Sequence, residues 1–236
     1  LVGTALAWHD GTLRALPALA ALVGAVLIQI GTNLSNDVLD FRRGADHAER
    51  LGPTRVTQAG LLAPRTVALG AAAAYALAAL AGVYLVAVAG VPILVLGIVS
   101  IVSGVLYTAG PFPLAYVGLG DPFVLVFFGL AAVAGTYYVQ AGRVTPTALA
   151  LGMAVGALAI AILNVNNLRD AVTDAAAGKR TLAVRLGPAR TRRYFQRVVA
   201  TAFVIPVALV AARILGWPAL VVLIALPPAV ALVRRV

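Results

Sequence analysis

The sequence has 236 residues, of which 62% are hydrophobic and only 11% are charged, and its mean hydropathy is +1.00. A soluble domain of this size would carry roughly 25% charged residues, so the composition excludes an ordinary soluble domain. The chain has no cysteine, which excludes disulfides and thiolate metal sites. The aromatic share of 7% is too low for base-stacking platforms, and we expect no nucleic-acid partner despite the formal net charge of +10.

Apolar runs of about 20 residues recur along the whole chain, which is the length that crosses a bilayer as a helix. They predict an all-α fold, a polytopic transmembrane helix bundle. Gly and Pro residues mark the breaks between the runs. We expect a short helix at 1–8, followed by seven full or nearly full spans at about 12–41, 64–89, 91–108, 121–140, 144–169, 189–212 and 216–236.

The distribution of Lys and Arg predicts the orientation of these spans. If the spans alternate in direction, one side receives all 18 basic residues except Arg14, Arg143 and Arg213. By the positive-inside rule the two long polar loops, 42–65 and 169–193, then face the cytoplasm. Most of these basic residues need no role beyond contact with lipid headgroups. Seven of the eight acidic residues fall on the same side, with Asp10 as the exception, and lipid contact does not explain them.

Two clusters of acids and amides end two of the apolar runs on that side. The first has helical spacing, i, i+3, i+4 and i+7, and consists of Asn33, Asn36, Asp37 and Asp40. The second has the spacing i, i+3 and i+7 and consists of Asn167, Asp170 and Asp174, with Asn166 four residues before Asp170. Each spacing puts the polar side chains on one face of a helix, so their oxygens can converge.

Carboxylate and amide oxygens without His or Cys favour a hard cation, and Mg²⁺ prefers a few carboxylates together with water and phosphate oxygens. Two opposed clusters could therefore hold a diphosphate through Mg²⁺. The basic residues that could contact the remaining phosphate oxygens are Arg55, Lys179 and Arg180. Two other interpretations are open: solvated helix ends, and a proton or cation pathway through the bundle. The pathway is less favoured because the far halves of the spans are almost entirely apolar.

These motifs resemble the UbiA-type intramembrane aromatic prenyltransferases. The first motif of that family is similar to Asn33 with Asn36, Asp37 and Asp40, and the second is similar to Asp170 with Asp174. Within the family the chain most resembles the 1,4-dihydroxy-2-naphthoate polyprenyltransferases of menaquinone synthesis, through "NDVLDFRRGAD", "GPTRVTQAG" and "NNLRDAVTDAAAGKRTLAVRLG". The family has nine spans, so residues 1–236 are expected to form a single transmembrane prenyltransferase domain that is truncated at both ends.

The resemblance implies transfer of a polyprenyl group from polyprenyl diphosphate to 1,4-dihydroxy-2-naphthoate, with Mg²⁺ as cofactor, in membrane lipid of the bacterial plasma (inner) membrane. The implied catalytic residues are Asp37, Asp40, Asp170 and Asp174, which with Asn36 form the implied metal site. The implied diphosphate contacts are Asn33, Asn36, Arg55, Asn167, Lys179 and Arg180, and Asp46 is a further candidate that would orient one of the cations.

Other roles follow from position. An apolar bundle interior would shield an allylic cation from water, and four tyrosines, Tyr107, Tyr116, Tyr137 and Tyr138, are candidates for a cation–π contact with it. Asp121 follows Gly120 at the start of a span and is interpreted as an N-terminal cap.

No residue is assigned to the loss of the acceptor's carboxylate. The open alternatives are another acceptor, namely homogentisate, 4-hydroxybenzoate or a glycerol phosphate lipid, and a cation-coupled membrane transporter.

Overall fold

The structure is a computed structural model that describes residues 1–42, 55–107, 109, 114 and 116–236. Within these residues it is helical and contains no strand. In chain order the elements are α1 (Val2–His9), α2 (Ala15–Arg42), α3 (Pro64–Ala89), α4 (Val91–Leu106), α5 (Gly120–Val124), η1 (Leu125–Ala131), α6 (Ala132–Ala141), α7 (Pro146–Arg169), α8 (Ala171–Ala176), α9 (Leu182–Leu186), α10 (Pro188–Ala211), η2 (Trp217–Ala225) and α11 (Leu226–Arg235).

Turn residues start and stop these helices as the sequence predicts. Proline lies in the first turn of α3, α4, α7 and α10, where its missing N–H would have no partner inside the helix. The side chain of Thr145 caps α7 by accepting a hydrogen bond of 3.1 Å from the backbone N–H of Ala148. Gly90 joins α3 to α4 at a φ of 77°, a conformation that only glycine adopts without strain.

Six helical segments are long and apolar enough to cross a membrane, among the described residues: α2, α3, α5 to α6 through η1, α7, α10, and η2 to α11. The predicted all-α membrane fold is thereby confirmed. The span predicted at 91–108 is shorter than expected, because the 16 residues of α4 extend about 24 Å. Large apolar side chains such as Leu80 and Ile162 are exposed on the outside of the bundle, where a lipid bilayer would cover them. The chain is an integral membrane protein.

Two of the predicted spans are not regular α-helices. Residues Leu125–Ala131 form a π-helical turn, η1, between α5 and α6, and residues Trp217–Ala225 form a 3₁₀ helix, η2, before α11. Wide π turns are often found beside functional sites. The η1 turn brings Phe127 and Phe128 to the wall of an apolar cavity, which is described below.

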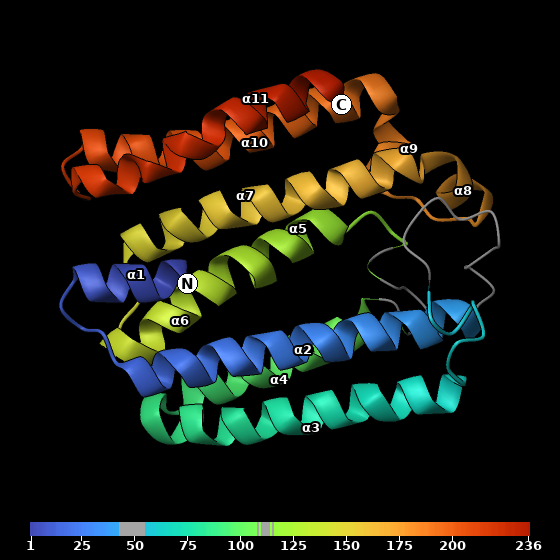
Figure 1. The fold of residues 1–236 in the computed structure, drawn as a ribbon, viewed down its shortest axis with the longest axis horizontal. Helices are drawn as coiled ribbons and strands as arrows, with labels where there is room; N and C mark the ends of the chain where they lie inside the picture. Colours follow the sequence, from blue (N-terminus) through green and yellow to red (C-terminus); the bar gives the residue numbers. More distant parts are fainter. Residues whose placement is uncertain (43–54, 108, 110–113, 115) are drawn as a thin grey trace.

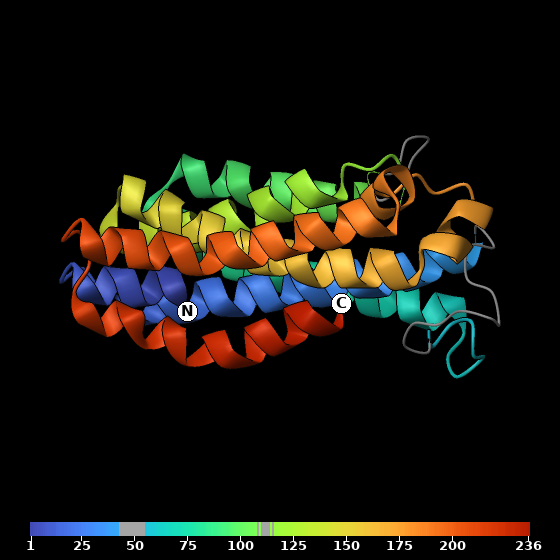
Figure 2. The same cartoon turned by 90° about the horizontal axis from the view of Figure 1, so that it is seen from above.

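The long helices lie side by side along a common axis, with α2 packed on α3 and α7 packed between α10 and the η1 segment (Figure 1). The turn from α3 to α4, the turn from α6 to α7 and the turn from α10 to η2 lie at one end of the bundle (Figure 2). The short helices α8 and α9, and the segment around Arg55, lie at the other end. We call this second end the polar end, because the ends of α2 and α7 bring both acidic clusters to it.

A close crossing of η1 and α7 depends on three glycines. Gly152 and Gly156 of α7 have the spacing of a small-xxx-small motif, which lets membrane helices approach closely. They face Gly129 of η1, where an added Cβ would lie 2.5 Å from the carbonyl oxygen of Gly152 and 2.8 Å from the Cα of Gly156. These obstacles are backbone atoms, so they cannot rotate away as a flexible side chain would.

We therefore expect Gly129→Ala to destabilise the protein by roughly 1–3 kcal/mol, the usual cost of forcing an extra group into a packed interior. Thermal unfolding of the detergent-solubilised protein measures this change. Gly82→Ala in α3 is the matched control, because no atom lies within 4 Å of its added Cβ. Equal unfolding temperatures for the two variants would contradict the glycine crossing.

Candidate active site

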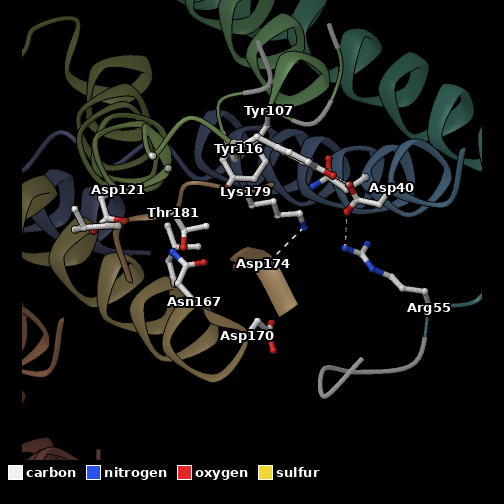
Figure 3. Close-up of a pocket in the computed structure, with 15 residues that line it drawn as sticks. Asp40, Arg55, Tyr107, Tyr116, Asp121, Asn167, Asp170, Asp174, Lys179 and Thr181 are labelled. Atoms are coloured by element: carbon white, nitrogen blue, oxygen red, sulfur yellow. Dashed lines mark hydrogen bonds and ion pairs between the residues drawn. The ribbon is translucent and has the colours of Figure 1, made fainter. Parts of the chain in front are cut away.

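A polar cavity of about 180 Å³ opens at the polar end of the bundle, between α2, the start of α5, and the α7 to α9 segment (Figure 3). Seven of the ten residues predicted for the site line it: Asn36, Asp40, Arg55, Asn167, Asp170, Asp174 and Lys179. The structure thus brings the two acidic clusters, which are about 130 residues apart in sequence, around one space. Tyr107, Tyr116, Asp121 and Thr181 also line this cavity.

The first cluster on α2 divides into two parts. Asn36 and Asp40, one helical turn apart, line the cavity. Asp37 does not, because its carboxylate accepts hydrogen bonds from the backbone N–H groups of Val56 (3.1 Å) and Thr57 (3.3 Å). Asn33 is exposed outside the cavity and accepts a hydrogen bond of 3.4 Å from Gln29. Asp37 therefore holds the backbone next to Arg55 in the arrangement that the structure describes.

The second cluster does not lie on one continuous helix face. Helix α7 ends at Arg169, and Asp170, with φ −93° and ψ 5°, joins it to the short helix α8 that carries Asp174. The interpretation of residues 167, 170 and 174 as one helical face is therefore wrong at Asp170. The turn still leaves all three side chains in the cavity wall. The sequence shows no Gly or Pro at this break, which is why the spacing alone predicted a longer helix.

Three of the four carboxylates that line the cavity among the described residues have a cationic partner, and the fourth, Asp121, is described below. Asp40 pairs with Arg55 at 3.3 Å, and Asp174 pairs with Lys179 at 3.6 Å. Both oxygens of Asp170 accept hydrogen bonds from Arg169 at 2.7 Å. These ion pairs neutralise carboxylates that are otherwise partly desolvated. The same cations are close enough to the cavity to exchange a carboxylate for another anion.

Tyr116 joins the two halves of the cavity. Its hydroxyl donates a hydrogen bond of 3.2 Å to Asp40, and its ring lies 4.9 Å from the Nζ atom of Lys179 in a cation–π contact. The backbone N–H of Arg180 donates to the carbonyl oxygen of Tyr116 at 2.8 Å, while the Arg180 side chain is exposed outside the cavity. The contact between Arg180 and Tyr116 is therefore made by the backbone of Arg180 and not by its guanidinium group.

Asp121 has a different role from the one predicted. The N-cap residue of α5 is Leu119, and no side chain caps this helix, so the interpretation of Asp121 as a cap is wrong. Asp121 is buried at the cavity wall and accepts a hydrogen bond of 3.1 Å from Asn164. The sequence signal that could have indicated the role of Asp121 is Asn164. This polar residue interrupts the apolar run of α7 about two turns before Asp170.

The donor atoms of the cavity suit Mg²⁺. Among the described residues they are oxygens of carboxylates and amides, together with tyrosine and threonine hydroxyls, which hard cations prefer. No three acidic or histidine residues in the described ranges are close enough to form a ready-made metal cage. That spacing fits a Mg²⁺ ion that is held by one or two carboxylates and completed by substrate phosphate and water. Asp46, the further candidate, lies outside the described residues.

A second cavity, apolar and much larger, lies between α2, α3, α4 and the η1 to α6 segment and is partly open to the outside of the bundle. Its volume is about 740 Å³, and its wall consists mainly of Gly, Ala, Val, Leu, Ile and Phe. A row of aromatic rings connects the two cavities: Tyr107 in the polar wall lies 5.1 Å from Phe123, whose ring centroid lies 4.6 Å from that of Phe127 in the apolar wall.

The other two tyrosines lie away from the polar cavity. Tyr137 is fully buried at the opposite end, where its hydroxyl donates a hydrogen bond of 2.6 Å to Asp10. This bond, with a second from His9, lowers the pKa of Asp10 below its ordinary value of 3.8. Tyr138 packs against the cluster around Leu85 and Ile93. Of the four tyrosines considered from the sequence, Tyr107 and Tyr116 are the ones in the cavity wall.

Comparison with known proteins adds a family and several relatives. A model described as the UbiA prenyltransferase family matches residues 1–236. The chain is 44% identical over 200 residues to the 1,4-dihydroxy-2-naphthoate octaprenyltransferase of Escherichia coli, which covers 82% of this chain and 65% of the relative. It is 45% identical over 188 residues to the enzyme of that name from Mycobacterium tuberculosis, which covers 80% and 64% of the two chains.

A third relative of the same name, from Mycobacterium leprae, is 41% identical over 219 residues, covering 93% of this chain and 73% of the relative. The chain spans just under two thirds of the length of the Escherichia coli and Mycobacterium tuberculosis relatives. The resemblance that the sequence motifs predicted is confirmed by these matches.

Proposed function

The chain belongs to the UbiA prenyltransferase family, and from this premise we propose that it transfers a polyprenyl group from polyprenyl diphosphate to 1,4-dihydroxy-2-naphthoate. The product would be demethylmenaquinone, in the biosynthesis of menaquinone. The observation that carries this proposal is the pair of adjoining cavities: one lined by acids and cations, the other large and apolar. The names of the relatives support the choice of acceptor.

The polar cavity is suited to the diphosphate. UbiA prenyltransferases in general depend on a divalent metal. Here one or two of the carboxylates Asp40, Asp170 and Asp174, with Asn36 and Asn167 beside them, would hold each Mg²⁺ ion, which would neutralise the charge that builds on the leaving diphosphate. Arg55 and Lys179 would turn from their carboxylate partners to phosphate oxygens. Desolvation at the cavity wall strengthens these charge interactions.

Three predicted residues have a less direct place in this proposal. Asp37 would act through the backbone at Val56 and Thr57, which positions Arg55. A metal-binding role for Asp37 and phosphate contacts from Asn33 and Arg180 stay predictions, because the side chains of these residues lie outside the cavity wall.

The apolar cavity is suited to the isoprenoid tail, which is hydrocarbon and gains by leaving water. It would also keep water from the allylic cation that forms when the C–O bond to the diphosphate breaks. Tyr107, Phe123 and Phe127 form the row of rings between the two cavities, where their ring faces could stabilise that cation.

We place the polar end at the cytoplasmic face of the bacterial plasma membrane. The support is the positive-inside rule, since the basic residues Arg55, Lys179, Arg185 and Arg193 all belong to that end of the bundle. A soluble diphosphate headgroup would then enter from the cytoplasm while the tail stays in the membrane interior.

The choice of acceptor is tested with membranes that contain the protein, a labelled polyprenyl diphosphate and Mg²⁺. The acceptors are 1,4-dihydroxy-2-naphthoate, homogentisate, 4-hydroxybenzoate and a glycerol phosphate lipid, each in a separate reaction. We expect a labelled lipid product with the naphthoate. A product formed only with one of the other three would overturn the naphthoate assignment and keep the family chemistry. Ion flux in proteoliposomes without any diphosphate release would instead favour a transporter.

A further inference from the structure

Asp121 is a buried carboxyl group that the diphosphate site does not use. Its exposed fraction is 6%, and that of its partner Asn164 is 2%. The Asn164 amide donates one N–H to Asp121 Oδ2 (3.1 Å) and the other to the carbonyl oxygen of Ile160 (3.2 Å), so both of its donors are used and its orientation is fixed. Tyr194 of α10 lies within interaction range of the same carboxyl group.

The surroundings of Asp121 differ from those of the other cavity acids. Asp40, Asp170 and Asp174 each pair with a cation, whereas no Lys, Arg or His of the described residues forms an ion pair with Asp121. The titratable groups that face it are Tyr194 and Tyr107. A buried carboxyl group without a counter-ion is costly inside a membrane protein, and such groups generally mark functional positions.

Asp121 lies apart from the residues that are proposed to hold the diphosphate. In Figure 3 it lies at one end of the polar cavity, while Asp40 and Arg55 lie at the other. Gly120, the residue before it, is close to Tyr107, since a Cβ there would lie 3.3 Å from the Tyr107 hydroxyl oxygen. Asp121 is thus next to the row of aromatic rings, beside which the allylic end of the donor would lie.

We propose that Asp121 is the catalytic base that contacts the aromatic acceptor, taking the proton of the ring hydroxyl next to the reacting carbon and later returning it. This inference rests on the proposed function, because it assumes an acceptor with a hydroxyl beside a carboxylate-bearing ring carbon. Asn164 and Tyr194 hold the carboxylate in place for this role.

The step balances without an oxidant. The hydroxyl O–H bond breaks, its proton goes to Asp121, and the oxygen becomes a ketone oxygen. The carboxylate-bearing ring carbon forms a bond to the allylic carbon, whose C–O bond breaks with the electron pair leaving on the diphosphate. The resulting β-keto carboxylate loses CO₂, the electrons of that C–C bond form an enolate, and the enolate oxygen recovers the proton from Asp121. One base therefore serves both bond formation and decarboxylation.

The test compares the wild-type protein, Asp121→Asn and Asp121→Glu in membranes, with 1,4-dihydroxy-2-naphthoate as acceptor and pH as the variable. We expect Asp121→Asn to lower kcat roughly 10²–10⁴-fold at pH 7, the usual loss of a general base, while the KM for the donor stays unchanged. The loss should shrink as pH rises, because the ring hydroxyl then ionises in solution. Asp121→Glu should retain more activity than Asp121→Asn.

Asp10→Asn is the matched control, since Asp10 is a tyrosine-bonded carboxyl group at the opposite end of the bundle, and it should leave kcat unchanged. A loss in Asp121→Asn that is the same factor at every pH would indicate a structural role and overturn the inference. Wild-type kcat in Asp121→Asn would do the same.

A second measurement uses only the wild-type protein, so it does not depend on whether a variant folds. The methyl ether of the ring hydroxyl next to the carboxylate has no proton to give, so the wild-type protein should bind it as a competitive inhibitor and form no product. Conversion of this ether at the normal rate would overturn the role of Asp121. A wild-type protein that is inactive with every hydroxylated aromatic acceptor would overturn the proposed function, and this inference with it.

Discussion

Asp174→Asn is expected to lower kcat for prenyl transfer by about 10³-fold or more. Asp174 is buried at the cavity wall and pairs with Lys179 at 3.6 Å. The neutral amide removes a charge from the proposed metal site, and metal ions contribute several kcal/mol of charge stabilisation in the transition state, where each 1.36 kcal/mol is a tenfold change in rate. The measurement is the rate of labelled product formation in membranes that contain equal amounts of each protein.

Asp10→Asn serves as the control here too, because it changes a carboxylate that lies far from the polar end. Raising the Mg²⁺ concentration should recover part of the lost rate in Asp174→Asn, as expected for a weakened metal site. If Asp174→Asn keeps a rate within threefold of wild type at low Mg²⁺, Asp174 is not part of the metal and diphosphate site.

Gly97→Phe is expected to abolish transfer of long prenyl chains while short chains are still accepted. Gly97 of α4 lines the apolar cavity, and no atom lies within 4 Å of an added Cβ there, so a larger side chain can start from this position into open space. The ring would occupy space that the proposed tail needs. Geranyl diphosphate and an octaprenyl diphosphate, used as alternative donors, measure the effect as a ratio of rates.

Gly97→Ala is the matched control, because a methyl group fills little of a cavity of about 740 Å³. It should change the ratio of the two rates by less than threefold. An equal loss with both donors in Gly97→Phe would indicate general damage to the fold, and an unchanged ratio would mean that the tail lies elsewhere.

The sequence predicted the helices well because lipid imposes a simple rule. A spanning segment must satisfy its backbone hydrogen bonds internally and present apolar side chains, so long apolar runs bounded by Gly and Pro identify the helices directly. Details that depend on neighbouring helices were not predictable in this way. The π turn at Leu125–Ala131 accompanies the close approach of Gly129 to α7, and periodicity within one segment does not report such a contact.

The polar cavity was predicted in outline, and its individual acids less well. Asp40 and Asp174, which the matched spacings assigned to one site, line the same cavity, and their role there stays a prediction. The orientation of the Asp37 side chain was not predictable, since it depends on a tertiary contact with the backbone at Val56 and Thr57. Asp121 has a sequence context typical of a cap, and its partner Asn164 lies 43 residues away. Long-range hydrogen bonds of this kind become visible in three dimensions.

The most direct test of the account is equilibrium binding of a non-reacting polyprenyl diphosphate analogue to the purified wild-type protein, with and without Mg²⁺. The central claim is that the polar cavity holds a diphosphate through a metal ion between carboxylates of α2 and of the α7 to α8 segment. We predict tight binding with Mg²⁺ and loss of binding, by at least tenfold in Kd, after chelation. Affinity that is unchanged by chelation, and also by Asp174→Asn, would contradict the claim.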